Sequence, residues 1–166
     1  MKASDDVLVA DLGEKKLYHI RESVLQRSYP LSYGARTRSC QAGSLGTPWG
    51  LHEISTKHGH GEVPGMVFTG RVATGATWMD CPDAGSEQKC LVSTRILRLR
   101  GLEAGLNAGP GMDSHDRYIY IHGTNHPEKF PENISAGCIQ MLDEDLIDLF
   151  EKVPEGTQVW LSHPKG

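Results

Sequence analysis

Short segments in which apolar and polar residues alternate follow one another along most of the chain. Residues 6–12, DVLVADL, alternate in this way, and a glycine-containing turn separates them from residues 15–20, KKLYHI. Two such segments across a short turn are typical of a β-hairpin. Further candidate strands lie at residues 23–34, 48–54, 65–70, 90–101, 117–123 and 157–162. The pattern therefore predicts a fold that is mainly β, with few helices.

The segment 90–101, CLVSTRILRLRG, has two mixed faces. As a strand it would carry on one face Leu91, Ser93, Arg95, Leu97 and Leu99. The opposite face would carry Val92, Thr94, Ile96, Arg98 and Arg100. Because successive side chains of a strand point to opposite faces, one wholly apolar face would have identified the side of the core. Both faces mix apolar and polar residues, so the sequence does not show which face packs against the core.

One segment has the periodicity of a helix. Its apolar residues recur at helical spacing: Leu146, Ile147, Phe150 and Val153. The first turn, residues 143–145, is acidic, which the helix dipole favours, and Asp143 is the expected cap of the free N–H groups. Pro154 and Gly156 end the helix.

The composition indicates one folded domain. The chain has 166 residues, of which 38% are hydrophobic and 23% charged, and 19 glycines fit a fold with many turns. With no repeat and no linker, we expect a single domain over residues 1–166 with a core at about 7–161, and a monomer. The formal charge of −4 and the absence of a Lys/Arg run argue against a nucleic-acid partner. No apolar stretch is long enough to predict a transmembrane segment.

The N-terminal sequence lacks the long apolar segment of a signal peptide. Two interpretations follow: the protein is cytosolic, or a leader preceding this chain has been removed.

Four cysteines stand at positions 40, 81, 90 and 138, and no pair has C-x-x-C spacing. A zinc ribbon or a thioredoxin-like site is therefore not expected. Cys81 and Cys90 bracket a polar loop. They would form a disulfide in an oxidising compartment or remain two free thiols at the base of a hairpin.

Cys138 lies in SAGCI, after three small residues: Ser135, Ala136 and Gly137. Small neighbours let a substrate carbonyl approach and leave backbone N–H groups available to it. The N–H groups of Gly137 and Cys138 are thus candidate donors to the oxyanion of a tetrahedral intermediate. A thiolate also needs a base.

His122 is the candidate base, because it follows the apolar run YIYI at the end of a predicted strand. Gly123 can turn its carbonyl back toward the imidazole and so fix its tautomer. The alternative is a structural cysteine and a surface histidine with no common role.

The order of the motifs favours catalysis. IHGT at 121–124, then S-x-G-C-I-x-M at 135–141, then an acidic helix, closely resembles the catalytic domain of the L,D-transpeptidases, the YkuD-like family. VLVADLGEKKLYHI and GTPWGLHEI resemble upstream segments of that family, and DSHDRYIYIHGTN resembles its approach to the catalytic histidine. The resemblance covers most of residues 7–161. It implies a β-sandwich or barrel-like domain with one clear helix after the catalytic cysteine.

By this resemblance, Cys138 is the nucleophile, His122 its base, and Gly123 the residue whose carbonyl orients that base. Ser135 and Gly137 frame the pocket. Two positions depart from the signature. Ala136 replaces a second histidine, which removes a hydrogen-bond donor near the thiolate. Gln140 replaces an arginine, which removes a charge that could attract a carboxylate.

The family's chemistry implies a substrate and an intermediate. Cys138 would attack a peptidoglycan tetrapeptide stem at the carbonyl before the terminal D-alanine, giving a thioester acyl-enzyme that an amine or water resolves. The resemblance implies no metal and no organic cofactor, and it makes carbapenems candidate inhibitors. The compartment would be the bacterial cell envelope or periplasm. Alternatives are an inactive member that binds peptidoglycan, and an L,D-carboxypeptidase or amidase with the same site.

Other histidines have two interpretations each. His52, His58 and His60 cluster in one segment; we expect an exposed loop, with a metal site as the alternative. His126, between base and nucleophile, would line the cleft or, as we expect, be solvated, and the same expectation holds for His115.

Arg71, Arg95 and Arg117 are candidates for binding substrate carboxylates, although surface arginines on strands are common. Among the tryptophans, Trp160 is expected in the core and Trp78 in the cleft.

Overall fold

The computed structural model describes residues 5–80 and 91–164. Along these residues one helix, α1 (Asp143–Lys152), accompanies ten strands. The first five strands are β1 (Asp6–Asp11), β2 (Lys16–Arg21), β3 (Val24–Pro30), β4 (Gly50–His58) and β5 (Met66–Thr69). The others are β6 (Val72–Thr77), β7 (Ser93–Gly101), β8 (Tyr120–Gly123), β9 (Ile139–Met141) and β10 (Gln158–Leu161). The prediction of a mainly β fold with one helix is confirmed.

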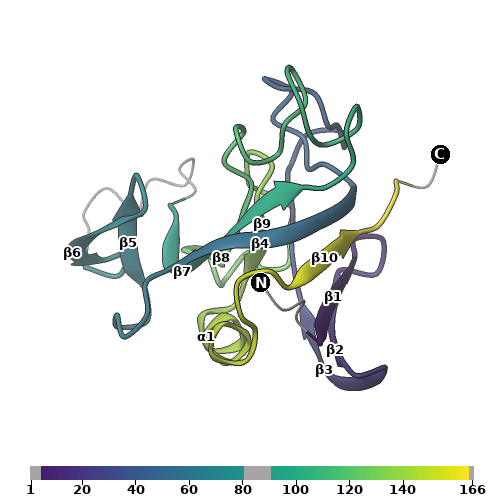
Figure 1. Cartoon of the computed structure of the whole chain (residues 1–166). Helices are drawn as coiled ribbons and strands as arrows, with labels where there is room; N and C mark the ends of the chain where they lie inside the picture. The colour runs from purple at the N-terminus through teal and green to yellow at the C-terminus, as the bar shows by residue number, and fades with distance from the viewer. Residues whose placement is uncertain (1–4, 81–90, 165–166) are drawn as a thin grey trace.

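All ten strands belong to one mixed sheet with the order β3-β2-β1-β10-β4-β7-β5-β6 (Figure 1). β8 leaves this path, pairing antiparallel with β7 and parallel with β9. The C-terminal strand β10 inserts between β1, to which it is parallel, and β4. The N-terminal and C-terminal strands therefore lie side by side in the middle of the sheet. Through β10, the hairpin of β1 and β2 is connected to β4 and so to the strands around His122.

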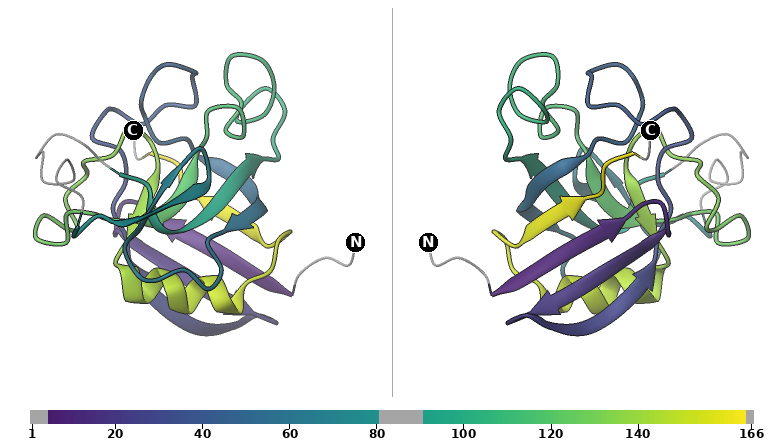
Figure 2. Two further views of the ribbon diagram at one scale, coloured as in Figure 1. Left: turned by 90° about the vertical axis from the view of Figure 1, so that its left-hand side faces the viewer. Right: turned by 90° about the vertical axis from the view of Figure 1, so that its right-hand side faces the viewer.

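Helix α1 lies beneath the sheet (Figures 1 and 2). Leu146, Leu149 and Phe150 point from it into the main core, where they meet apolar side chains of β1, β7, β8 and β9. A second, smaller apolar cluster contains Met66 and Phe68 of β5 together with Ile96 and Tyr120. Burial of apolar area on this scale is the main favourable contribution to folding.

Two strands were not predicted. β6, VATGAT, is mostly exposed and contains no apolar alternation, and β9 has three residues within a segment rich in small and polar residues. Both are defined by their partners, since β6 pairs with β5 and β9 pairs with β8. Pairing of this kind depends on distant residues and leaves little local signal.

Three expectations are wrong. Asp143 does not cap α1: Leu142 occupies the N-cap position without a side-chain bond, and the Asp143 carboxylate instead accepts a hydrogen bond from Thr94. His52 is fully buried in β4 rather than exposed in a loop. Trp160 is only partly buried, at the sheet surface, where its ring lies 5.3 Å from that of His163.

Among the described helices, none is long and apolar enough to cross a membrane. The predicted disulfide partners Cys81 and Cys90 lie outside the described residues. The expectation of a single domain stays a prediction.

Candidate active site

Of the two residues predicted to do the chemistry, His122 lies on β8 and Cys138 directly precedes β9, the adjacent parallel strand. The register of β8 and β9 pairs Ile121 with Ile139 and His122 with Gln140. Because side chains alternate along a strand, His122 and Gln140 share one face of the sheet with Cys138, two residues before Gln140. Strand spacing then makes the Cα atoms of His122 and Cys138 diagonal neighbours, roughly 8 Å apart.

His122 has only 2% of its surface exposed. Its Nδ1 lies 2.8 Å from the Gly123 carbonyl oxygen, and because a carbonyl can only accept, Nδ1 carries the proton. Burial lowers the pKa of His122 to about 4, with the Gly123 carbonyl opposing that shift. The ring is therefore neutral at pH 7, with the lone pair of Nε2 available as a base.

Neighbouring side chains surround both the carbonyl and the Cα of Gly123. The buried hydroxyl of Ser93 donates to its carbonyl oxygen at 3.1 Å, so this oxygen accepts from a serine and from His122. A Cβ on Gly123 would lie 2.6 Å from Asp143 Oδ1 and 2.8 Å from Thr94 Oγ1. Only glycine fits here without moving its neighbours.

The sulfur of Cys138 lies against the main chain of the segment that enters β8. The Tyr120 N–H donates to Sγ at 3.4 Å, and the thiol donates to the Tyr118 carbonyl at 3.4 Å. The side chain is half-buried and packs against the cluster of Met66, Phe68, Ile96 and Tyr120. An N–H group aimed at sulfur stabilises negative charge there.

The turn before Cys138 is held by Ser135. Its hydroxyl donates to the Cys138 carbonyl at 2.5 Å and accepts a long bond, 3.4 Å, from the Gly137 N–H. Gly137 has φ +118°, in the region that favours glycine. Ala136 is exposed beside this turn. Of the two predicted oxyanion donors, the Gly137 N–H thus already has a partner within the turn.

Gln140 is fully buried, and in the described structure neither end of its amide has a hydrogen-bond partner. Its cross-strand neighbour Ser32 also has a buried hydroxyl, which forms no hydrogen bond with any described group. Where the family signature has an arginine, this chain therefore has a neutral, enclosed amide next to His122.

His126 is 6% exposed, so the expectation of a solvated residue is wrong. Its Nδ1 lies 3.2 Å from Glu128 Oε1 and its Nε2 3.3 Å from the Asn125 amide nitrogen. His115 is half-buried. His126 lies in the loop that leaves β8, whereas His115 lies in the segment between β7 and β8.

His52 is a structural residue. Its ring nitrogens lie 3.0 Å from the Gly50 carbonyl and 2.8 Å from the Ser114 hydroxyl, and burial lowers its pKa to about 4. His58 bonds to Thr56, and His60 is exposed. No group of three or more His, Cys, Asp or Glu side chains in the described part of the chain is arranged to hold a metal ion.

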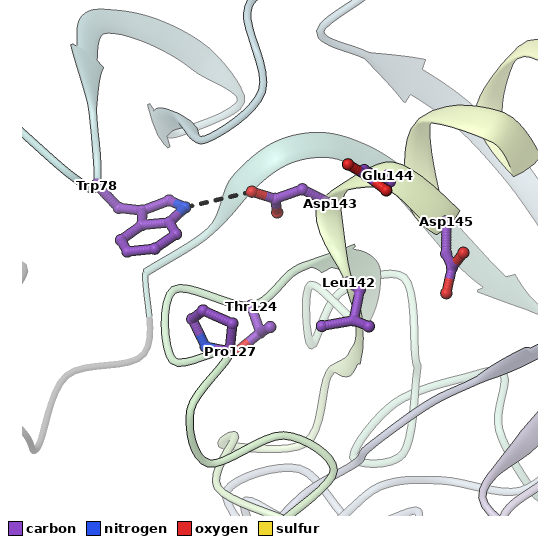
Figure 3. A pocket seen from close by; sticks show the side chains of 7 residues that line it. All are labelled: Trp78, Thr124, Pro127, Leu142, Asp143, Glu144 and Asp145. Atoms are coloured by element: carbon purple, nitrogen blue, oxygen red, sulfur yellow. Dashed lines mark hydrogen bonds between the residues drawn. The ribbon is translucent and has the colours of Figure 1, made fainter.

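The structure places Trp78 in the lining of a pocket of about 250 Å³ at the start of α1 (Figure 3). Its indole N–H donates to Asp143 Oδ2 at 3.4 Å, while Thr94 donates to Oδ1 at 2.6 Å. Burial raises the pKa of Asp143, and the bonds from Thr94 and Trp78 oppose that shift. This network packs directly on Gly123, and sequence analysis did not identify Ser93, Thr94 or Asp143 as part of the site.

Two of the three predicted carboxylate-binding arginines are structural. Arg95 is buried and donates to the carbonyls of Glu62 and Thr94. Arg117 donates to the carbonyls of Ser39 and Gly46. Arg71 instead donates to the hydroxyl of Tyr120, the residue whose main-chain N–H donates to Cys138 Sγ.

The mixed sheet with one covering helix has the fold of the L,D-transpeptidases. Residues 5–161 match the family described as the YkuD L,D-transpeptidase catalytic domain. The chain belongs to this family.

Solved structures agree with the assignment of the fold. An L,D-transpeptidase from Xylanimonas cellulosilytica is 18% identical, with a TM-score of 0.57 over 97% of this chain and 62% of that one. L,D-transpeptidase 3 from Mycobacterium tuberculosis, in complex with a faropenem-derived adduct, is 17% identical, with a TM-score of 0.57 over 96% and 60%. LdtMt1 in complex with imipenem has a TM-score of 0.55 over 95% and 59%, at 17% identity.

Among curated proteins, YqjB of Bacillus subtilis is 32% identical over 100 residues, and its name assigns it provisionally to the L,D-transpeptidases. The match covers 55% of this chain and 57% of YqjB. The chain thus aligns with little more than half of that relative's length.

Proposed function

We propose that this protein is a cysteine-dependent L,D-transpeptidase that acts on peptidoglycan tetrapeptide stems. The observation that supports this most is the state of His122. It is buried and neutral, its Nδ1 bonds to the Gly123 carbonyl, and the register puts its side chain on the face that carries Cys138. A neutral imidazole whose Nδ1 carries the proton is the form that can accept a proton at Nε2.

The proposed reaction is acyl transfer in two steps. Nε2 of His122 takes the thiol proton as Cys138 Sγ attacks the carbonyl before the terminal D-alanine. The C–N bond then breaks, D-alanine leaves with a proton from His122, and a thioester remains. An amine from a second stem attacks the thioester, forms the new amide and releases the thiol. The N–H of Cys138 is the proposed donor to the oxyanion.

The same site is proposed to react with carbapenems. The solved complexes of LdtMt1 with imipenem and of L,D-transpeptidase 3 with a faropenem-derived adduct support this. Opening of the lactam by Cys138 would leave a thioester with no leaving group to diffuse away, so the adduct would persist.

Intact-mass spectrometry after incubation with a tetrapeptide stem, with and without an amine acceptor, tests the proposal. We expect an acyl adduct on the native protein and none on Cys138→Ala. Cys40 is a matched control, because it is a free cysteine but only 5% exposed, and Cys40→Ala should retain the adduct. A native protein that forms no adduct, or an adduct that persists in Cys138→Ala, would contradict it.

Two departures from the signature support a second candidate, an inactive member that binds peptidoglycan stems. Ala136 supplies no side-chain donor, and Gln140 carries no charge. The same incubation separates the candidates. Transfer to the amine indicates a transpeptidase, release of D-alanine with water as acceptor indicates an L,D-carboxypeptidase, and stem binding without acylation indicates the inactive member.

Because its proposed substrate is the cell wall, we propose the bacterial cell envelope or periplasm as its location. Fractionation of cells that express the natural gene, followed by immunodetection, tests this.

A further inference from the structure

Two tyrosines bracket the thiol of Cys138. Tyr118 accepts a hydrogen bond from Sγ through its carbonyl, and Tyr120 donates to Sγ through its N–H. The Tyr118 side chain is 56% exposed, although its main chain touches the sulfur. The residue whose carbonyl contacts the nucleophile is therefore itself open to solvent.

Two arginines surround these tyrosines. The guanidinium of Arg98 lies 5.2 Å from the centre of the Tyr118 ring and that of Arg71 lies 5.8 Å from it. Arg71 also donates to the Tyr120 hydroxyl at 3.1 Å. Arg98, on β7, is directly opposite Tyr120 in the antiparallel register, which places it on the face of Cys138. We call Arg71, Arg98 and Tyr118 the arginine cluster.

The arginine cluster has no carboxylate of its own. The arginines that form ion pairs among the described residues are Arg21, Arg27 and Arg100, and neither Arg71 nor Arg98 forms one. Arg98 donates to the His115 carbonyl, and its buried Nε has no partner among the described residues. Two uncompensated positive charges in a protein of net charge −4 call for an explanation.

Neighbouring histidines respond to this charge. Burial lowers the pKa of His58, and the charges of Arg71 and Arg98 lower it further, against Glu155. Burial, followed by the charge of Arg98, likewise lowers the pKa of His115, against Asp113 and Asp116.

We propose that the arginine cluster binds a substrate carboxylate beside the thiol of Cys138. Resting on the proposed function, this assigns to the cluster the free carboxylate of the residue that follows the scissile carbonyl. Guanidinium groups suit this role because their N–H groups pair with a carboxylate in a fixed geometry. The buried and neutral Gln140 cannot supply such a charge, so Arg71 and Arg98 supply it in this chain.

Alkylation of Cys138 tests the cluster without any stem peptide. Iodoacetate is an anion and iodoacetamide is neutral. Both form an S–C bond to the thiolate with loss of iodide, so the ratio of their rates reports the charge that an incoming carboxylate meets. Peptide mapping assigns the rates to Cys138. We expect this ratio to exceed that of glutathione and to fall about threefold or more in Arg71→Gln and in Arg98→Gln.

Arg100→Gln is the matched control. Arg100 is on the same strand as Arg98 and its change removes the same charge, but Arg100 already pairs with Glu53, so the ratio should stay at its native value. An unchanged ratio in Arg71→Gln would overturn the proposal. Because Arg71 lies in the turn between β5 and β6 and not within a strand, this variant decides the matter if Arg98→Gln fails to fold.

Tetrapeptides that end in a carboxylate or in a carboxamide give the second measurement. We expect the native protein to be acylated faster by the free acid, and Arg71→Gln to lose that preference. If neither peptide acylates the native protein, the proposed function fails, but the alkylation ratio still decides whether a carboxylate site exists. If Arg71→Gln is still acylated faster by the free acid than by the carboxamide, the proposed carboxylate site is contradicted, but the proposed transpeptidase function is not.

Discussion

The two faces of the sheet formed by β7, β8 and β9 have different roles: one packs in the hydrophobic core and the other carries the candidate active site. One face carries Leu97, Ile121, Ile139 and Met141, which have no exposed surface and pack with the apolar side of α1. The other carries the polar groups of the site: Arg98, Tyr120, His122, Cys138 and Gln140. Since neighbouring residues belong to opposite faces, each strand supplies stability and chemistry in alternation.

The difference explains how a buried, polar site is tolerated. His122 and Gln140 are removed from water at a cost in free energy, and the amide of Gln140 has no described partner to offset it. Burial of apolar side chains on the face beneath α1 opposes this cost. The face that carries the chemistry is thus held in place by the face that does not.

The sharpest test uses two adjacent residues. Ile139→Ala should lower the free energy of unfolding by about 2–5 kcal/mol, because it opens a cavity in the core, while the folded fraction keeps its thiol reactivity. Cys138→Ala should abolish acylation and leave unfolding little changed. Urea titrations and intact-mass assays on both variants check this, and similar losses of stability in both would contradict the assignment of the faces.

Acid should destabilise the fold through two buried histidines, one in the candidate site and one outside it. His122 is in the site and His52 is in the framework, and burial lowers the pKa of each from 6.5 to about 4. Between these values the unfolded chain binds protons that the native state excludes, so stability is full above pH 6.5 and falls as the pH drops towards 4. The loss is on the order of 3 kcal/mol for each histidine.

Urea unfolding at pH 7 and pH 4.5 measures this loss. His122→Gln and His52→Gln should each reduce the difference between the two pH values. His60→Gln is the control, because His60 is exposed and should leave the difference unchanged. An equal difference in all three variants would show that other groups cause the acid sensitivity.

Gly123→Ala should damage the face that carries the chemistry. The added Cβ meets Asp143 Oδ1 and Thr94 Oγ1, so the main chain must shift and take the carbonyl that orients His122 with it. We expect acylation to slow by about a hundredfold and stability to fall by about 1–3 kcal/mol. Gly43→Ala is the control for backbone strain without a clash: its φ is +79° and a Cβ there meets nothing within 4 Å, so it should lower stability by about 1 kcal/mol and leave acylation unchanged. Native acylation rates in Gly123→Ala would disprove the role of this carbonyl.

The smallest expected effect compares two serines. Ser93 donates to the carbonyl of Gly123, and Ser55 donates to that of Arg98 at 3.2 Å. Loss of either hydroxyl should cost about 1 kcal/mol of stability. Only Ser93→Ala should also slow acylation, by a few-fold, because its acceptor orients His122. Equal acylation rates in the two variants would limit Ser93 to a structural role.

Sequence alone predicted those parts of the fold that have a local pattern. The hairpin of β1 and β2, the strand that ends at His122 and the helix from Asp143 were all predicted near their observed positions. The mixed faces of β7 could not be interpreted locally, because Leu97 packs in the core while Arg98 faces the site. That distinction depends on strands far away in the sequence.

The candidate site was predictable only as far as its motif extends. Cys138, His122 and Gly123 stand in a recognisable order, but Ser93 and Thr94 reach Gly123 from a strand with no sequence signature. Asp143 was interpreted as a helix cap because acidic residues are common at that position. Its carboxylate instead bonds across the sheet to Thr94, a contact that helix rules cannot indicate.

The main-chain ladder between β8 and β9 fixes the geometry of base and thiol without help from the loop that joins them. Residues 127–132 in that loop are largely solvent-facing and lie outside the ladder. Substrate preference can therefore diversify by insertion or exchange in this segment while the reacting pair stays in register. For protein engineering, residues 127–132 are the place to graft new recognition sequences onto an unaltered reaction centre.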